Sequence, residues 1–339
     1  MKSVPFHSCR NLLGKQTSTG GRRRGKPAAF LVSMALRSCP RRRSFAWCFS
    51  YSSASFPSCR FRLTLPCTGP LSAAREFHVG PLMPHFDPYD SLVPVFIETE
   101  IPKRVHQMGT AIFREMWGEP FLITAAHVTD ELKNGVLLVP TVQGLSPIDG
   151  YMAYIDLPPE VSRLEDNVDI AYYRLSSEFA AQLSYHFKPL PQGRGEVIQS
   201  ALELTVCSAS GYPLTKGKKN GQTYSSEIFS FRGVAARQET YDQFGLSPEQ
   251  SIVIHFHKKR AVHPGTMDAF PTPSLKGSSG GGIFAWPPGA ELSDDWTLPR
   301  LVGVIHSFKE KEGLIIGTTL VPLLAAIGLG RMKKFGGIQ

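Results

Sequence analysis

Three residues of this chain could together carry out acyl transfer: Ser279 as the nucleophile, His127 as the base and Asp169 as the acid that orients the base. A serine hydroxyl is a weak nucleophile, so it needs a base within hydrogen-bond reach, and imidazole is the side chain whose ordinary pKa suits that task. A carboxylate on the other imidazole N–H would fix the tautomer and stabilise the imidazolium. The residue types therefore favour nucleophilic hydrolysis through a covalent intermediate.

The sequence around each residue fits its role. Ser279 lies in the run Gly277-Ser278-Ser279-Gly280-Gly281, where glycine permits a tight turn that exposes a hydroxyl and frees backbone N–H groups. His127 ends the apolar run FLITAAH, and Asp169 stands directly before the apolar run that starts at Ile170. Each residue is thus expected at the end of a strand or in a turn, where its side chain can reach a substrate.

The motifs TAAH at His127, DIA at Asp169 and GxSGG at Ser279, in that order along the chain, resemble those of the trypsin-like (chymotrypsin-fold) serine peptidases. The resemblance covers about residues 88–328. It implies a serine endopeptidase that hydrolyses peptide bonds of a protein or peptide substrate through an acyl-enzyme, without a cofactor. It also implies that the backbone N–H groups of Gly277 and Ser279 form the oxyanion hole.

Neighbouring residues compete for two of these roles. Glu165 and Asp166 are rivals of Asp169, but they precede the apolar run and are expected on the surface. Ser278 is a rival of Ser279, but only Ser279 has glycine both two residues before it and directly after it. Secreted members of the resembled family have an aspartate in place of Ser278, which pairs with a newly cut N-terminus, so activation by that ion pair is not expected here.

The resemblance also implies a pocket for the residue before the scissile bond, lined by Pro273, Lys276, His306, Ser307 and Phe308. Pro273 takes the place of the aspartate of trypsin, so cleavage after Lys or Arg is not expected. His306 and Lys276 would make the pocket positive and favour an acidic or small polar residue. If His306 instead points into the barrel, we expect a preference for small or medium apolar residues.

The N-terminal part of the chain sets the net charge of +9. Residues 1–75 carry 14 of the 37 Lys and Arg and none of the 28 Asp and Glu, so the rest has 23 basic and 28 acidic residues, a net of −5. No nucleic-acid or membrane partner is therefore expected for the folded part. The alternatives to an active enzyme are a catalytically silent protease-like binding or regulatory module and a basic-tailed nucleic-acid or membrane-associated protein. The sequence leaves the oligomeric state open.

Residues 1–82 form a basic segment rich in Arg and Ser without sustained periodicity, and we expect them to be disordered. They fit a transit-like targeting segment, a secretory signal, an anion-binding arm, or a stretch that precedes the true start at Met83. Only one of the six cysteines, Cys207, lies beyond this segment. A domain without internal disulfides favours either a reducing compartment or a bacterial-type enzyme. The expected compartment is the cytoplasm, unless the basic segment targets the chain to an organelle. In every case a chain that starts at Met83 should fold and keep its activity.

Strands must position the three residues. Short apolar, β-branched or aromatic runs predict strands at 93–97, 108–113, 121–124, 136–140, 151–155 and 170–175, and again at 202–208, 228–233, 251–257, 282–286, 301–305 and 314–319. Residues 187–195 form a linker rich in Pro and Gly, so six strands lie on either side of it. This pattern predicts an all-β fold of two packed six-stranded antiparallel β-barrels (chymotrypsin-like), within a protease domain at 88–330.

Other segments predict helices and loops. Residues 176–184 predict a short helix and residues 130–132 a helical turn, while 213–222 and 257–264 are expected to be long exposed loops. Residues 314–330 lack charges but are too short for a membrane span, so we expect a buried strand, a short C-terminal helix from near Pro322 and a basic tail at 331–339. His255 and His257 alternate on a strand without a Cys or carboxylate nearby, so no metal site is expected.

Overall fold

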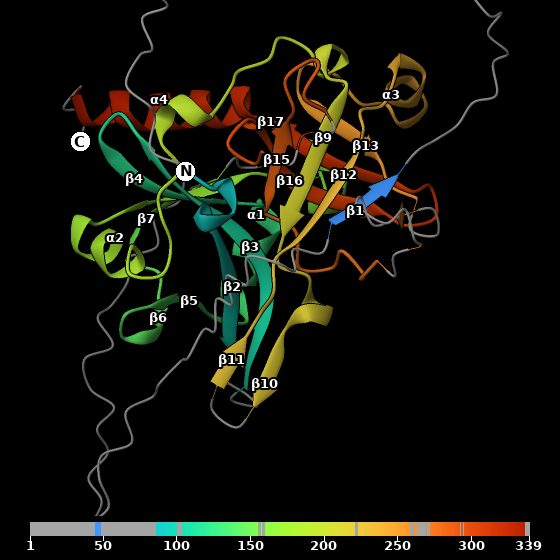
Figure 1. Cartoon of the computed structure of the whole chain (residues 1–339). Coiled ribbons are helices and arrows are strands. Elements are labelled where there is room, and N and C mark those ends of the chain that lie inside the picture. Colours follow the sequence, from blue (N-terminus) through green and yellow to red (C-terminus); the bar gives the residue numbers. More distant parts are fainter. Residues whose placement is uncertain are drawn as a thin grey trace, which may run out of the picture.

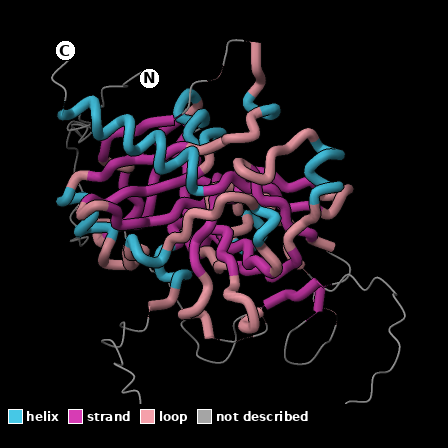
Figure 2. The backbone as a smooth tube through the Cα atoms, turned by 90° about the horizontal axis from the view of Figure 1, so that it is seen from above, coloured by secondary structure: helices cyan, strands magenta, loops and turns pink. Residues whose placement is uncertain are grey.

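Two curled sheets dominate the structure, a computed structural model that describes residues 45–48, 86–99, 104–154, 157, 160–220, 223–257, 261–262, 269, 272–291, 293 and 295–335. The sheets are almost wholly antiparallel and lie against each other, with one helix near the C-terminal end of the chain (Figure 1). Seen from above, the strands fill the middle of the molecule and most of the helical segments lie toward its edge (Figure 2). The predicted all-β class with two packed antiparallel units is confirmed.

The first sheet has seven strands in the spatial order β6-β5-β2-β3-β4-β8-β7. Their bounds are β2 (Leu92–Thr99), β3 (Arg104–Met116), β4 (Glu119–Thr124), β5 (Gly135–Thr141), β6 (Gly144–Pro147), β7 (Gly150–Tyr154) and β8 (Ala171–Leu175). Strand β4 is apolar from Phe121 to Ile123, and these residues are buried on both faces of the strand. Phe121 and Ile123 face the core between the sheets, whereas Leu122 faces the core of the first sheet itself.

The second sheet has eight strands in the spatial order β13-β17-β16-β15-β9-β12-β1-β14. Their bounds are β1 (Phe45–Cys48), β9 (Val206–Gly211), β12 (Phe229–Val234), β13 (Ser251–His255), β14 (Ala261–Val262), β15 (Gly282–Ala285), β16 (Arg300–Lys309) and β17 (Leu314–Thr319). Strand β1 runs parallel to β12, and the other pairings in this sheet are antiparallel. A separate hairpin joins β10 (Lys218–Asn220) to β11 (Thr223–Ser225).

Four α-helices lie in the described part of the chain: α1 (Ala126–Thr129), α2 (Ser177–Leu183), α3 (Gln238–Phe244) and α4 (Leu320–Phe335). Short 3-10 turns lie at η1 (Pro88–Ser91), η2 (Asp130–Lys133), η3 (Arg163–Glu165), η4 (Gln192–Arg194), η5 (Ala201–Glu203) and η6 (Leu214–Lys216). The predicted helix at 176–184, the helical turn after His127 and the C-terminal helix are confirmed. In Figure 1, α4 lies at the opposite end of the molecule from the β10–β11 hairpin.

The structure corrects several details of the sequence prediction. All twelve predicted strands occur, but β1, β6, β10, β11 and β14, and also α3, were not predicted. Residues 213–222 and 257–264, expected to be loops, contain η6, β10 and β14. The strand predicted at 202–208 begins only at Val206, because Ser200 and Glu203 form a capping box around η5. Of residues 1–82 only β1 is described, so the disorder expected for the others lies outside the described residues.

The C-terminal segment packs as a strand and a helix. Buried Leu320, Leu323 and Ile327 of α4 join the apolar cluster between the two sheets. This cluster also holds Phe121 from β4 and Phe284 from β15, so it ties the two sheets together. Helix α4 continues to Phe335, which corrects the expectation of a tail from residue 331. Within the residues described, no helix has the length and apolar character of a membrane span.

Candidate active site

His127 and Asp169 form a directly bonded pair. Strand β4 ends at Thr124, and α1 then carries His127 in its first turn. The His127 ring Nδ1 lies 2.5 Å from Asp169 Oδ2, and the His127 backbone N–H donates to Asp169 Oδ1 over 2.8 Å. The Asp169 side chain is 5% exposed and that of His127 is 38% exposed. The imidazole is thus held by a buried carboxylate while part of the ring remains open to solvent.

The environment keeps Asp169 ionised at neutral pH. Burial alone raises the pKa of Asp169, but the hydrogen bonds from the His127 ring and backbone and the charge of His127 outweigh burial, so the net shift is downward. An ionised Asp169 accepts the Nδ1 proton of a neutral His127, which leaves Nε2 as the ring atom able to take a proton. This is the tautomer that a general base beside a serine requires.

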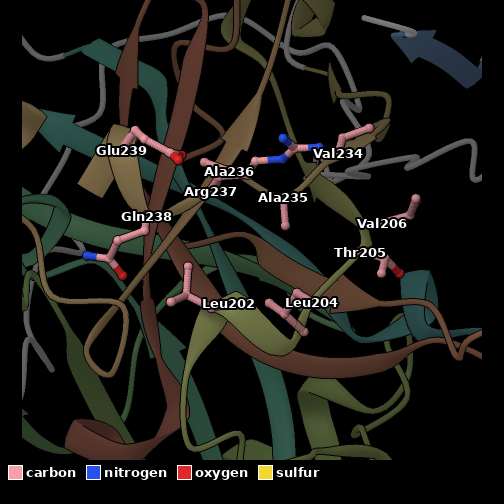
Figure 3. Close-up of a pocket in the computed structure, with 10 residues that line it drawn as sticks. All are labelled: Leu202, Leu204, Thr205, Val206, Val234, Ala235, Ala236, Arg237, Gln238 and Glu239. Carbon is pink, nitrogen blue, oxygen red and sulfur yellow. The ribbon is translucent and has the colours of Figure 1, made fainter. Parts of the chain in front are cut away.

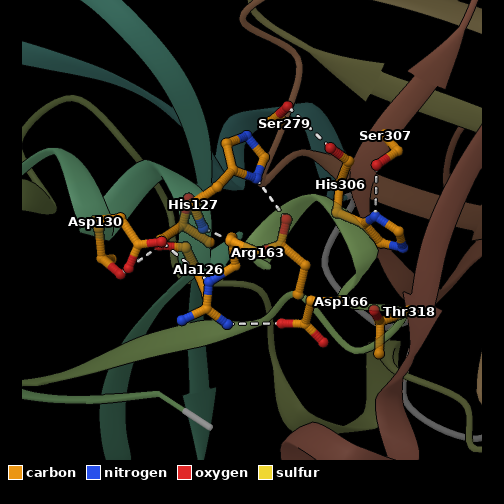
Figure 4. Close-up of polar contacts among 12 residues, drawn as sticks. Ala126, His127, Asp130, Arg163, Asp166, Ser279, His306, Ser307 and Thr318 are labelled. Atoms are coloured by element: carbon orange, nitrogen blue, oxygen red, sulfur yellow. Dashed lines mark hydrogen bonds and ion pairs between the residues drawn. The ribbon is translucent and has the colours of Figure 1, made fainter. Parts of the chain in front are cut away.

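The turn that carries Ser279 is held between the two sheets. The Gly280 N–H donates to the Ile305 carbonyl of β16 over 2.6 Å, and the Thr110 N–H of β3 donates to the Ser279 carbonyl over 2.8 Å. The Ser279 hydroxyl donates to the His306 carbonyl over 3.3 Å, as Figure 4 shows. In this state the Ser279 hydroxyl is therefore bonded to backbone on β16, and it would have to rotate before it could reach another group.

The same turn lies directly against the end of β4. A Cβ added to Gly280 would lie 3.1 Å from the backbone nitrogen of Ala125, two residues before His127, and would collide with the Thr110 carbonyl and the Thr124 hydroxyl. Gly280 has φ +84°, in the left-handed region that favours glycine. The glycine after Ser279 therefore allows the turn that carries Ser279 to approach the segment that carries His127.

Two backbone N–H groups of the turn are free to bind an oxyanion. The Leu214 N–H donates to the Lys276 carbonyl over 2.7 Å, and in a planar trans peptide the next N–H, that of Gly277, points the opposite way. Gly277 has φ +91°, which glycine adopts without strain. Among the residues that the structure describes, neither the Gly277 nor the Ser279 N–H has an acceptor. This arrangement suits the stabilisation of negative charge on a carbonyl oxygen.

Sequence reasoning missed Thr110, which fixes this turn. Thr110 is fully buried on β3, and its hydroxyl donates to the Gly277 carbonyl and accepts from the Tyr212 N–H, each over 2.9 Å. The Thr110 carbonyl in turn accepts from the Thr124 hydroxyl over 2.7 Å. No sequence signal marks Thr110, because 167 residues separate it from Gly277.

The rival residues occupy other positions. Asp166 is bound by Arg163 and by the Val168 N–H, not by His127, and Glu165 is exposed. The Ser278 side chain is 2% exposed, and its hydroxyl has no partner among the described residues. The acid in contact with His127 is thus Asp169, and the more accessible of the two serines is Ser279.

The residues expected to line the substrate pocket differ in exposure. Lys276 is exposed, and Pro273, Ser307 and Phe308 are half-buried, with the Phe308 ring packed edge-on against Phe256. His306 is buried, and its Nδ1 lies 2.9 Å from the Ser307 hydroxyl, while its Nε2 has no partner among the described residues. Burial lowers the pKa of His306 to about 4, partly opposed by the negative charge of Asp169. His306 is therefore uncharged at neutral pH.

No other cluster of the described residues competes with this site. An open cavity of about 550 Å³ lies on the second sheet and is lined by Leu202, Leu204, Thr205, Val206, Val234, Ala235, Ala236, Arg237, Gln238 and Glu239 (Figure 3). It lies at the Val206 end of β9, roughly 16 Å along the strand from Gly211, which contacts Ser278. The rings of His255 and His257 stack 6.2 Å apart, and the described residues hold no group of three side chains that could bind a metal ion.

Neither a protein-family model nor a curated protein matches this sequence. Among solved structures, the chain is similar to Glu endopeptidase in complex with MPD, at 13% identity and a TM-score of 0.41 over 74% of this chain and 95% of that one. It is also similar to protease Anisep from Arthrobacter nicotinovorans (12%, TM-score 0.40, over 71% and 95%) and to catalytically active tobacco etch virus protease complexed with product (14%, TM-score 0.37, over 72% and 78%). Such low scores decide neither the nucleophile nor the substrate.

Proposed function

We propose that this chain is a serine endopeptidase of the chymotrypsin fold that hydrolyses peptide bonds through an acyl-enzyme on Ser279. The observation that carries the proposal is the His127–Asp169 hydrogen bond close to the turn that carries Ser279. At Gly280 this turn lies against the backbone of Ala125, and two of its N–H groups have no acceptor among the described residues. The weak likeness to solved proteases plays no part in this reasoning.

The proposed reaction begins when the Ser279 hydroxyl turns from the His306 carbonyl to His127 Nε2. Ser279 Oγ then attacks the carbonyl carbon of the substrate while its proton passes to Nε2, and the carbonyl oxygen gains a negative charge. The N–H groups of Gly277 and Ser279 bind that oxyanion, and ionised Asp169 stabilises the imidazolium.

Collapse of this tetrahedral intermediate breaks the C–N bond. The Nε2 proton passes to the departing amine, and the acyl group stays on Ser279 as an ester. A water molecule then gives one proton to Nε2 and attacks the ester carbon, and the same proton returns to Ser279 Oγ when the C–O bond breaks. The products are a free acid and a free amine, and every group of the site regains its first state.

The substrate preference depends on the charge of the pocket. Uncharged His306 offers a hydrogen-bonding group and no positive charge, which leaves exposed Lys276 as the only cation among the five expected lining residues. The expected preference for acidic residues rested on positive charge from both His306 and Lys276, and only Lys276 still supports it. A small or medium uncharged residue before the scissile bond fits the site best, and Lys or Arg finds no anion among the five lining residues to pair with.

Labelling with a fluorophosphonate tests the proposed reaction, because the probe reacts only with a serine that a base activates. The full-length wild type should be labelled, and Ser279→Ala should not. Ser278→Ala is a matched control one residue away, and it should be labelled like wild type because the Ser278 hydroxyl has no partner among the described residues. A folded wild type that takes no label would instead favour the catalytically silent binding module.

A peptide library varied at the residue before the cut tests the pocket. We expect small or medium uncharged residues to be cleaved best at both pH 6 and pH 8. Efficient cleavage after Arg or Lys would contradict the assignment of Pro273 to the pocket base. A clear preference for acidic residues that disappears in Lys276→Ala would show that the charge of Lys276 dominates the pocket.

A further inference from the structure

The His127–Asp169 pair joins two segments that approach from different parts of the first sheet. His127 lies on α1, which follows β4, and Asp169 lies in the loop that leads into β8, two residues before the strand begins. Imidazole and carboxylate must keep hydrogen-bond geometry through each reaction cycle, since a misplacement of about 1 Å can cost on the order of a hundredfold in rate. Any further contact between these two segments would therefore help to keep that geometry.

Arg163 makes such contacts with both segments (Figure 4). Its Nε donates to Asp130 Oδ2 over 3.0 Å, and its Nη1 donates to Asp166 Oδ2 over 2.6 Å. Asp130 follows His127 by three residues, and Asp166 precedes Asp169 by three residues. One guanidinium thus connects the turn after the base to the loop before the acid.

The Asp166 end of this connection is firmly fixed. Asp166 Oδ1 accepts from the Val168 N–H over 2.9 Å, and the Asp166 N–H donates to the Arg163 carbonyl over 3.3 Å. The Asn167 carbonyl accepts from the Thr318 hydroxyl of β17 over 3.5 Å, which links the same loop to the second sheet. A displacement of Arg163 would therefore pass directly to the backbone that carries Asp169.

This arrangement differs from an ordinary surface ion pair. The side chains of Arg163 and Asp166 are only 18% and 5% exposed, so water screens them poorly, whereas the Asp130 side chain is 35% exposed. Burial lowers the pKa of Arg163, but the hydrogen bonds and charges of Asp130 and Asp166 outweigh burial and raise it. The guanidinium stays charged and can bind two carboxylates at once through its planar fork, which a lysine ammonium cannot reproduce.

We propose that Arg163 is a positioning residue, which holds the His127 segment and the Asp169 loop at the separation that the His127–Asp169 hydrogen bond needs. It acts through Asp130 and Asp166 and touches neither the substrate nor the reacting atoms. The role in catalysis rests on the proposed function, whereas the role in holding the imidazole does not.

The test compares Arg163→Gln and Arg163→Lys with Arg174→Gln in the full-length chain. Arg174 is a matched control, because its Nη2 lies 2.5 Å from Glu119 Oε1 in the same sheet with side chains 23% and 25% exposed. The first readout is the NMR signals of the ¹⁵N-labelled His127 ring, assigned through their change in Asp169→Asn. The second readout is the rate of fluorophosphonate labelling.

We expect Arg163→Gln to shift the His127 ring signals in the direction seen for Asp169→Asn and to slow labelling by about 10- to 100-fold. Arg163→Lys should recover part of both effects, and Arg174→Gln should leave both unchanged. If Arg163→Gln does not fold, Asp130→Asn removes one arm of the connection and is measured in the same way.

The two readouts separate the two proposals. His127 signals that stay as in wild type in Arg163→Gln would overturn the positioning role, whatever the labelling rate. Signals that shift equally in Arg163→Gln and Arg174→Gln would overturn it too, because the effect would then be general. A wild type that takes no label, while its His127 signals respond to Arg163→Gln alone, would end the proposed function and support the positioning role.

Discussion

Replacement of Thr110 by valine tests whether this residue holds the turn that carries Ser279. Valine has nearly the same shape but lacks the hydroxyl that donates to the Gly277 carbonyl and accepts from the Tyr212 N–H. Each buried group left without its partner costs about 1–3 kcal/mol, so the two together lower the free energy of unfolding by about 2–6 kcal/mol. The added methyl packing places the expected value near the lower end of that range.

The same change should impair the proposed oxyanion hole. Loss of one oxyanion donor lowers the turnover number of a serine hydrolase by about 10²–10³-fold, and a displaced Gly277 donor should cost somewhat less, about 10–100-fold. Urea unfolding followed by tryptophan fluorescence gives the stability, and the fluorophosphonate labelling rate gives the effect on the site. The labelling rate is measured without urea, where most of the variant is folded.

Thr141→Val provides the control for Thr110→Val. Thr141 is 1% exposed on β5, and its hydroxyl also donates to a backbone carbonyl, that of Gly144, and accepts from a backbone N–H, that of Gln143. It should lose a comparable free energy of unfolding and label at the wild-type rate. If Thr110→Val is destabilised to the same degree but labels as fast as wild type, the turn does not depend on Thr110 and the reasoning is wrong.

Three further outcomes are expected. Gly280→Ala should abolish labelling and strongly destabilise the fold, because the backbone at residue 280 has a positive φ and the added Cβ would collide with the Thr110 carbonyl. Gly193→Ala, where a Cβ would meet no other atom, should change neither the labelling nor the stability. Burial lowers the pKa of His306 from 6.5 to about 4 in the folded chain, so between these pH values the proton binds mainly to the unfolded state. The free energy of unfolding should therefore fall by about 3 kcal/mol from pH 7 to pH 4. If the free energy of unfolding of His306→Gln fell with the same slope against pH as that of wild type, this expectation would be contradicted. A chain that starts at Met83 loses β1, whose partners among the described residues are β12 and β14, and it should still be labelled. Loss of labelling in the folded truncation would give the N-terminal segment a role.

The strands that carry the site were predictable because their sequences are unusual. Strand β4 is apolar at every position from Phe121 to Ile123, since its two faces pack against two different cores, and few loops have such a run. The unpredicted elements lack this property. Strand β6 has the sequence GLSP, the β10–β11 hairpin is polar, and α3 buries only Tyr241. Their conformations depend on what they pack against, which local sequence does not reveal.

The residues proposed for catalysis could also be recognised from the sequence, but the residues that hold them in place could not. The residues proposed for catalysis lie in short motifs whose neighbouring residues have a structural purpose. The glycine after Ser279, for example, occupies a position where a Cβ would collide with other residues. Thr110 and Arg163 stand in no motif, and they act on partners brought near by the fold: Gly277 in one case, Asp130 in the other. The uncharged state of His306 could not be predicted from the sequence either, because it follows from burial and not from residue type.

The turn that carries Ser279 leads into β15, but contacts from both sheets hold it. Its carbonyls and N–H groups are bound by Thr110 of β3, by Ile305 of β16 and by Leu214 after β9, so both sheets contribute to its shape. His127 and Asp169 adjoin strands of the first sheet, since α1 follows β4 and the Asp169 loop leads into β8. The apolar cluster between the sheets therefore helps to set the distance from Ser279 to His127, and any loosening of that cluster should separate these two residues before either sheet unfolds.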